Sequence, residues 1–166
     1  MNGFKVVKIV LNTSPIIFLS KIDCLELLSN CFPEIYVPYG VVQELCDYSL
    51  PITIKTCSLS SNSAAYVQGA LGRLHQGELE AMMLAQELAA DYVVLDDLLA
   101  RRKANRIGLK VIGTLGILLL LKKRGLLSSE LSWCKIEQLT NKHGLYISSQ
   151  LLQQIKAQLL GIDYQS

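Results

Sequence analysis

Residues 5–12 read Lys5-Val6-Val7-Lys8-Ile9-Val10-Leu11-Asn12, a mostly apolar run that ends at an amide side chain. A continuous apolar run of this length is typical of a parallel strand that is buried on both faces. Ser14 and Pro15 follow after one residue, Thr13. Serine can cap a helix and proline suits its first turn, so the pair predicts a helix start. The opening of the chain therefore predicts a buried strand over 5–11 and a helix directly after it.

The same alternation of strand and helix continues along the chain. Further strands are expected at 34–37, 52–55, 92–95 and 110–112, and helices at 23–29, 39–46, 64–71, 77–90, 98–107 and 113–123. Four or five strands that are each separated by a helix imply βαβ units. The pattern predicts an α/β fold with a central, mostly parallel sheet.

The last part of the chain has a different pattern. Residues 128–139 and 148–160 read as two helices joined by a short polar segment. We expect residues 1–125 to form the main domain and residues 126–166 a helical extension that packs on it. The apolar character of this tail also favours a homodimer.

Composition narrows the class of protein. With 166 residues, of which 51% are hydrophobic and 18% charged, the chain is expected to form one domain with a sizeable core. The net charge of +2 is too small to identify a nucleic-acid binder from totals alone. The five cysteines form no C-x-x-C pair, so we interpret them as small buried hydrophobes in a reducing cytoplasm.

The most apolar segment, 111–121, raises the question of a membrane anchor. It holds eleven residues, and Lys122, Lys123 and Arg124 follow it. That length is too short to cross a bilayer, so a buried helix explains it better. No secretory signal opens the sequence. We therefore expect a cytoplasmic protein without a membrane segment.

Acidic and amide side chains stand where several of these elements begin or end. They are Asn12, Glu44, Glu78, Asp96 and Asp97. In open α/β sheets, ligands bind beyond the carboxyl ends of the strands. Converging carboxylates repel one another unless a cation or proton joins them, and Mg²⁺ and Mn²⁺ prefer such oxygen ligands. A divalent-metal site is one interpretation, and ordinary helix caps are the other, since Glu78 and Asp97 lie near predicted helix starts.

The two adjacent aspartates should differ in role. Neighbouring residues of a strand point to opposite faces. We expect Asp97 to face the metal and Asp96 to support the site, with Asp96 a weaker metal candidate.

Basic residues follow the aspartate pair closely. They are Arg101, Arg102, Lys103, Arg106 and Lys110. Beside a metal crevice they could hold a nucleic-acid backbone, or they could simply form a solvated helix face. His75 is a possible catalytic base, although a histidine at a helix start is the simpler interpretation. Neither the Walker spacing nor G-x-G-x-x-G occurs, which argues against a nucleotide-binding domain.

Several segments together resemble a known family. They are Asn12-Thr13-Ser14-Pro15-Ile16-Ile17, Val41-Val42-Gln43-Glu44-Leu45, Gly77-Glu78-Leu79-Glu80-Ala81, Leu95-Asp96-Asp97 with Ala100-Arg101-Arg102, and Val111-Ile112-Gly113-Thr114-Leu115-Gly116. In this order and spacing the chain resembles a PIN domain, and more narrowly a prokaryotic branch related to VapC-type toxins. The resemblance covers nearly the whole chain and implies a three-layer α/β/α sandwich of four to five strands.

The resemblance also implies an activity. PIN domains of this type are Mg²⁺- or Mn²⁺-dependent single-strand ribonucleases, and toxin members are held in check by an antitoxin protein. Carried over by position, Asn12, Glu44, Glu78 and Asp97 would line the metal crevice. The residues implied to contact the substrate are Thr13, Ser14, Thr114, Arg101, Arg102 and Arg106.

Two departures from the family pattern leave an alternative open. Active PIN nucleases usually carry Asp at the first position, where this chain has Asn12, and an acid often stands where it has Leu99. A weakened or inactive PIN domain that binds RNA or a protein is therefore the second hypothesis. A small-molecule α/β enzyme is a third, for which no positive motif is present.

Overall fold

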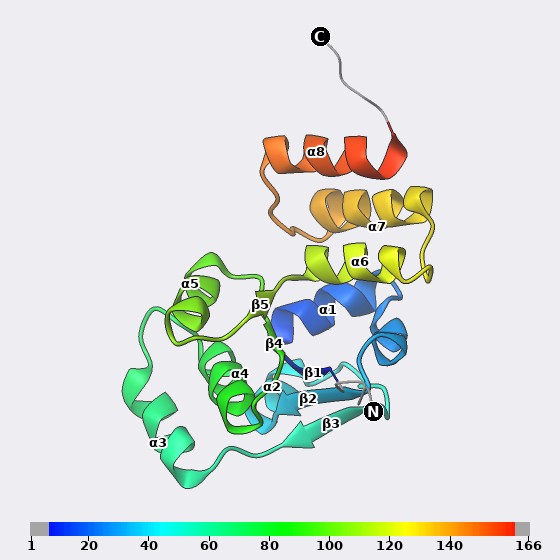
Figure 1. Ribbon diagram of the computed structural model, residues 1–166. Helices are drawn as coiled ribbons and strands as arrows, with labels where there is room; N and C mark the ends of the chain where they lie inside the picture. Colours follow the sequence, from blue (N-terminus) through cyan, green and yellow to red (C-terminus); the bar gives the residue numbers. More distant parts are fainter. Residues whose placement is uncertain (1–6, 162–166) are drawn as a thin grey trace, which may run out of the picture.

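A five-stranded parallel sheet forms the centre of the molecule, in the order β3-β2-β1-β4-β5 (Figure 1). The computed structural model describes residues 7–161. The strands are β1 (Lys8–Leu11), β2 (Glu34–Pro38), β3 (Ile54–Cys57), β4 (Tyr92–Val94) and β5 (Val111–Ile112). The predicted α/β fold is thereby confirmed, while residues 5 and 6 of the predicted first strand lie outside the described residues.

The central strand β1 is buried on both faces, as its apolar run predicts. Ile9 pairs in register with Ile35 of β2 and with Tyr92 of β4. The side chains of Ile9 and Leu11 enter one hydrophobic cluster, and that of Val10 enters the other. This alternation divides the core into two layers, one on each side of the sheet.

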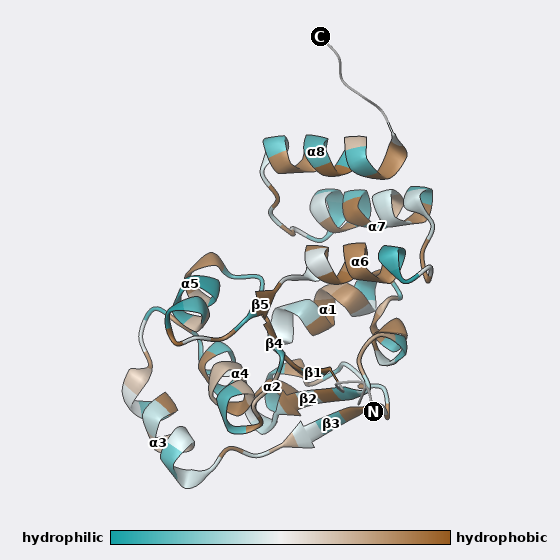
Figure 2. Cartoon of the chain, in the orientation of Figure 1, coloured by the Kyte–Doolittle hydropathy of each residue, from teal (hydrophilic) through white to brown (hydrophobic). Residues whose placement is uncertain are grey.

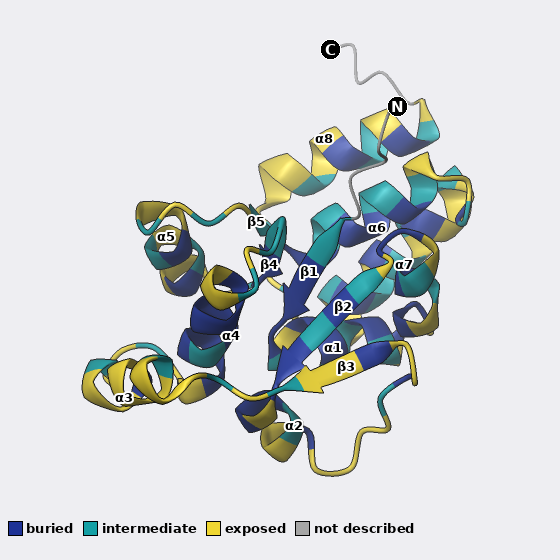
Figure 3. Cartoon of the chain, turned by 60° about the horizontal axis from the view of Figure 1, so that its bottom comes forward, coloured by how far each residue is buried: buried dark blue, intermediate teal, exposed yellow. Residues whose placement is uncertain are grey.

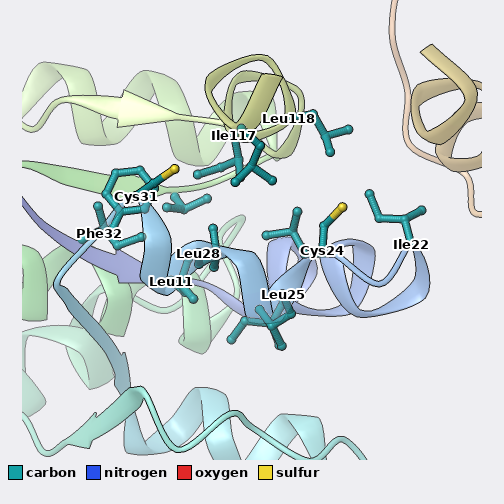
Figure 4. Packing of buried hydrophobic residues seen from close by; sticks show 14 of the residues in the cluster. Leu11, Ile22, Cys24, Leu25, Leu28, Cys31, Phe32, Ile117 and Leu118 are labelled. Carbon is teal, nitrogen blue, oxygen red and sulfur yellow. The ribbon is translucent and has the colours of Figure 1, made fainter. Parts of the chain in front are cut away.

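One face of the sheet is covered by four helical elements. These are α1 (Thr13–Lys21), the 3₁₀ helix η1 (Leu25–Asn30), α2 (Tyr39–Leu45) and α6 (Thr114–Lys123). Figure 4 shows Leu28 and Phe32, which flank the end of η1, packed near Ile117 of α6 and Leu11 of β1. The loop and helices between β1 and β2 therefore belong to the same core as α6.

The other face is covered by α3 (Ser61–Ala70), α4 (Gln76–Glu87) and α5 (Leu98–Arg106). Helix α4 packs directly on β1, β2 and β4, and nearly its whole first two turns are buried. Helix α3 packs on α4 and exposes most of its surface (Figure 3). The buried α4 thus fixes the position of its own N-terminus at one edge of the sheet.

Helix α6 lies between α1 and α7 (Ser129–Lys142) (Figure 1), and the middle of α6 is hydrophobic (Figure 2). Ile117, Leu118 and Leu121 are fully buried there. The expectation of a buried helix at 111–121 agrees with this position. None of the helices within residues 7–161 combines the length and apolarity needed to cross a bilayer.

The tail helices α7 and α8 (Ser149–Leu160) stack outward from α6 (Figure 1). Ile136 and Leu139 of α7, and Ile155 and Leu159 of α8, are buried in the same cluster as Ile9 of the central strand. Hydrophobic contact therefore runs without interruption from the sheet to the end of the described tail.

Three local predictions are wrong. Helix α1 begins at Thr13 with Asn12 as its N-cap, so Ser14 does not cap it. The helix predicted at 23–29 does not begin at Asp23, because its φ of 55° places that residue in the left-handed region, which Asp tolerates, and η1 begins after Cys24. Cys46 and Cys134 are exposed, whereas Cys24 and Cys31 are buried as expected.

Candidate metal and nucleic-acid site

The strand order reverses direction between β1 and β4, and polar residues follow both strands. Asn12 comes directly after β1, and Asp96 and Asp97 follow β4 after one residue. The backbone N–H of Asn12 donates to the carbonyl of Val94 at 3.2 Å, which ties the two strand ends together. In open α/β sheets this reversal point, at the carboxyl ends of the strands, is where ligands bind.

The side chain of Asn12 is buried without full hydrogen bonding. It is 4% exposed, and its Oδ1 atom has no hydrogen-bond partner among the described residues. A buried acceptor left unpaired costs on the order of 1–3 kcal/mol. A cation or its bound water would satisfy this oxygen.

Glu44 is held at the crevice by two neighbours. The hydroxyl of Thr13 donates to its Oε2 at 2.7 Å, so the residue after Asn12 fixes the α2 carboxylate. Its Oε1 would lie 2.7 Å from a Cβ placed at Gly77. The glycine in the first turn of α4 therefore lets the Glu44 carboxylate approach the start of that helix.

Glu78 is the buried carboxylate of the group. It is 7% exposed, and its Oε2 accepts a hydrogen bond from the backbone N–H of His75 at 3.0 Å. Burial raises the pKa of Glu78, the His75 hydrogen bond partly opposes this, and the negative charges of Asp97 and Glu44 raise it further. Glu78 thus lies in the electrostatic reach of both other acids.

The two aspartates have separate surroundings. Asp97 is exposed and is the N-cap of α5, with Oδ1 accepting from the backbone N–H of Ala100 at 2.8 Å. Asp96 accepts from the backbone N–H of Thr114 at 2.7 Å and from its hydroxyl at 2.6 Å. Burial raises the pKa of Asp96, and the two Thr114 hydrogen bonds oppose that rise. Asp96 therefore fastens the end of β4 to the start of α6, while the charge of Asp97 acts on Glu78.

Two residues that were predicted to contact substrate are turned inward. Thr114 is fully buried and its hydroxyl is used by Asp96. Arg101 is half-buried, and its Nη1 donates to the carbonyl of Leu95 at 3.3 Å in the space left by Gly113. Both side chains join β4 to its neighbours, and their contact with a substrate stays a prediction.

The other predicted substrate residues are on the surface. Ser14 is exposed at the start of α1, and Arg102 and Arg106 are exposed on α5. Thr13 is half-buried and bound to Glu44. These positions remain accessible to a chain that passes across the carboxyl edge of the sheet.

The donor set suits a metal ion that keeps much of its water. No group of three or more His, Cys, Asp and Glu side chains within residues 7–161 is arranged to hold a metal ion by itself. Mg²⁺ usually keeps several waters and binds through one or two carboxylates. Glu78 and Asp97, with the unpaired Oδ1 of Asn12, fit that manner of binding.

Sequence reasoning missed the glycines that shape this crevice. Gly77 receives Glu44, and Gly40 of α2 receives the carboxylate of Glu80 in the same way. Gln76 Nε2 donates to Glu80 Oε1 at 2.7 Å, which orients it. The only signal in the sequence was a small residue in the first turn of each helix.

Comparison with known proteins agrees with this architecture. The family model described as "DUF3368: PIN domain" matches residues 8–160. A PilT N-terminus domain protein, SSO1118, from the hyperthermophilic archaeon Sulfolobus solfataricus P2 superposes with a TM-score of 0.50 at 21% identity, over 79% of this chain and 95% of that chain. No curated protein shows a significant match. The family match extends over almost all of the described chain, tail helices included, and the chain therefore belongs to the PIN domain family.

Proposed function

We propose that this PIN domain is a divalent-metal-dependent nuclease that cleaves single-stranded RNA. The proposal is carried by the buried, unpaired Oδ1 of Asn12 at the carboxyl end of β1, and it is supported by Glu78, whose carboxylate lies in electrostatic reach of Asp97 and Glu44. PIN domains are generally nucleases, which supports phosphodiester hydrolysis over other reactions. Arg102 and Arg106 are exposed on α5, the helix that Asp97 caps, and they favour a phosphate-bearing substrate.

In this proposal each side chain has a stated task. Glu78, Asp97 and Asn12 hold Mg²⁺ or Mn²⁺, which when bound supplies an activated water and neutralises the leaving oxygen. Glu44, fixed by Thr13, adds negative charge at the crevice. Arg102 and Arg106 bind phosphates on either side of the scissile bond, and Ser14 lies at the crevice edge. Asp96 and Arg101 position the end of β4.

The first test measures cleavage of a labelled single-stranded RNA with Mn²⁺, Mg²⁺ or chelator. The Asp97→Asn variant keeps an N-cap acceptor for α5 but loses the charge, so it should stay folded. We expect cleavage to fall at least about 100-fold, since several kcal/mol of metal-dependent charge stabilisation is lost. The matched control is Glu137→Gln, an exposed carboxylate on α7, which should cleave normally. Undiminished cleavage by Asp97→Asn would refute the assignment.

The second candidate, a PIN domain that binds without cleaving, is favoured by one observation. Asn12 is neutral where an Asp would add a charge to the metal crevice. The Asn12→Asp variant separates the two functions. If the crevice is catalytic but weak, the variant should bind Mn²⁺ about tenfold more tightly and cleave faster, since 1.4 kcal/mol is a factor of ten. A crevice that serves only for binding should show no gain in cleavage.

We further propose that the protein acts as the toxin of a toxin–antitoxin pair, in the cytoplasm and as a homodimer. Growth arrest on expression, relieved by a co-expressed short neighbouring gene, would support the toxin role. Sedimentation of the purified protein measures the oligomeric state directly.

A further inference from the structure

The outer strand β5 leaves backbone groups unpaired at one edge of the sheet. Within residues 7–161 no strand follows β5 in the sheet order. The carbonyls of Lys110 and Ile112 accept hydrogen bonds from Val93 and Leu95, at 2.9 and 3.1 Å, so they point toward β4. Successive residues of a strand direct their backbone groups to opposite sides. The N–H and C=O of Val111 therefore point outward, where a further strand could pair with them.

Two hollows meet along this free edge. One has a volume of about 730 Å³ and the other about 520 Å³. Val111, Ile112 and Gly116 line both, so the hollows adjoin along β5, and together they are here called the β5 groove. The segment 145–148, which precedes α8, forms the opposite wall of the smaller hollow. An extended chain laid along β5 would run from one hollow into the other.

The groove presents large apolar side chains to solvent. Leu98, Tyr146 and Leu151 line the smaller hollow and are 59%, 90% and 42% exposed. The half-buried Leu119 and Leu120 line the larger one. Exposed apolar groups collected in one hollow are typical of a surface that binds a partner.

The charges in the groove define the chemistry of that partner. Lys122, Lys123 and Arg124 border the larger hollow, and Lys110 stands exposed at the same end of β5. The only acid among the lining residues of these two hollows is Asp96, which is bound to Thr114. A second copy of this chain would bring the same unbalanced cations, whereas an acidic segment would neutralise them.

We propose that the β5 groove binds an extended segment of a partner protein in which acidic and apolar residues alternate. The segment pairs with the outward N–H and C=O of Val111 as a sixth strand of the sheet. Its apolar side chains enter the two hollows, and its carboxylates meet Lys122, Lys123 and Arg124. The smaller hollow includes Asp96 and Arg101, which position the end of β4, but neither hollow is lined by Asn12, Glu44, Glu78 or Asp97. This inference therefore does not depend on the proposed cleavage.

The probe is a fluorescein-labelled peptide of about ten residues that alternates Glu and Val, titrated into the full chain and followed by anisotropy. A second peptide alternates Lys and Val. A third repeats the Glu-Val sequence with alternate backbone nitrogens methylated, so that it cannot pair as a strand. We expect the Glu-Val peptide to bind at least about tenfold more tightly than either of the others. Equal binding of all three would overturn the proposal.

Two pairs of variants locate the site. Leu151→Glu alters the groove, and Leu131→Glu is its control: both leucines are third residues after a capping serine and are 42% and 44% exposed. Lys123→Glu alters the basic end, and Lys142→Glu is its control, because each lysine is the last residue of its helix.

We expect each groove variant to bind the Glu-Val peptide about tenfold more weakly than the wild type, and each control to bind it with unchanged affinity. Equal loss in groove and control variants would place binding elsewhere and overturn the proposal. A change in oligomeric state of the groove variants alone, measured by sedimentation, would assign the groove to a second copy and also overturn it.

Discussion

Glu78 places a carboxylate where water has little access and where two other acids act on it. Its burial and the charges of Asp97 and Glu44 all disfavour the ionised form, and the hydrogen bond from His75 only partly compensates. Without a cation this arrangement costs folding stability at neutral pH. Functional sites commonly carry such a cost, since the groups that bind a ligand are not mutually satisfied without it.

The Glu78→Gln variant should therefore be more stable than the wild type in chelator at neutral pH. The folded-state pKa of Glu78 lies above its ordinary value of 4.5, so the folded protein keeps this proton to higher pH than the unfolded chain does. Stability consequently declines as pH rises from the ordinary glutamate range through the raised pKa. The glutamine is neutral throughout and can still accept from His75. Thermal melts at several pH values should show the advantage of the variant shrinking as pH falls toward 4.5.

Added Mn²⁺ should make the wild type more stable than the Glu78→Gln variant. The wild type gains stability by mass action when a cation joins its acids, and the variant has lost one of them. A variant that is less stable than the wild type in chelator would contradict the account of Glu78. An equal rise in melting temperature for both proteins would remove Glu78 from the metal ligands.

At the scale of elements, α3 is held to α4 through one capping serine. Ser60 accepts from the backbone N–H of Ser63 at 3.2 Å, and Glu87, the last residue of α4, accepts from the backbone N–H of Ser60 at 3.0 Å. The Ser60 hydroxyl also donates to Glu87 and is the main reason that the pKa of Glu87 is lowered. Because α3 buries little besides Val67, this junction matters more to it than its own packing does.

Replacing Ser60 with Ala should cost about 1 kcal/mol of unfolding free energy, the usual value of an N-cap. The lowered pKa of Glu87 contributes stability above its ordinary value of 4.5, and that contribution is lost as pH falls through the folded-state pKa. The difference between wild type and Ser60→Ala should thus narrow in acid, as urea denaturation at several pH values would show.

Ser148→Ala is the matched control for that experiment. Ser148 caps α8 by accepting from the backbone N–H of Leu151 at 3.3 Å, and no glutamate within residues 7–161 forms a hydrogen bond with it. It should cost a similar free energy with no comparable pH dependence. If the loss of unfolding free energy depends on pH in the same way for the two variants, Glu87 takes no part in the α3 cap.

Elements with strong apolar patterns could be predicted from the sequence, and irregular ones could not. The runs at 5–11 and 92–95 indicated buried strands because parallel strands leave no polar face. The Ser14-Pro15 pair predicts a later start for α1 than the structure has. Asn12 occupies the N-cap position, and Thr13, the first residue of the helix, binds Glu44 at the crevice. Asp23 adopts a left-handed conformation that spacing does not reveal.

In the candidate site, too, some features could be predicted from the sequence and others could not. Glu78 and Asp97 stand at helix starts, so the order of elements was enough to bring them to one edge of the sheet. The family resemblance implies substrate contact for Arg101 and Thr114, but in the structure they bond to Leu95 and Asp96, which directly follow β4. Such long-range pairing depends on how α5 and α6 pack beside that strand, which residue type does not encode.

At the scale of the whole molecule, the tail helices and the sheet share one core. Ile136 of α7 is fully buried in the cluster that contains Ile9 and Leu11. Lys135 Nζ also donates to the carbonyl of Ile22 at 2.6 Å, which links α7 to the segment after α1. If the tail belonged to a separate folding unit, few such contacts would cross to the sheet.

The Ile136→Ala variant should therefore destabilise the entire protein, by about 2–5 kcal/mol, the range for truncating a buried isoleucine. The chain contains one tryptophan, Trp133 on α7, so its fluorescence reports the tail while far-UV circular dichroism reports all helices. In urea the two signals should change together, for wild type and variant alike, because one cooperative unit gives coincident transitions. Leu131→Ala, on the same helix but 44% exposed, should shift both curves by only about 0.5 kcal/mol. A fluorescence transition that precedes the circular dichroism transition would mean that α7 and α8 unfold first, on a sheet that stays folded without them.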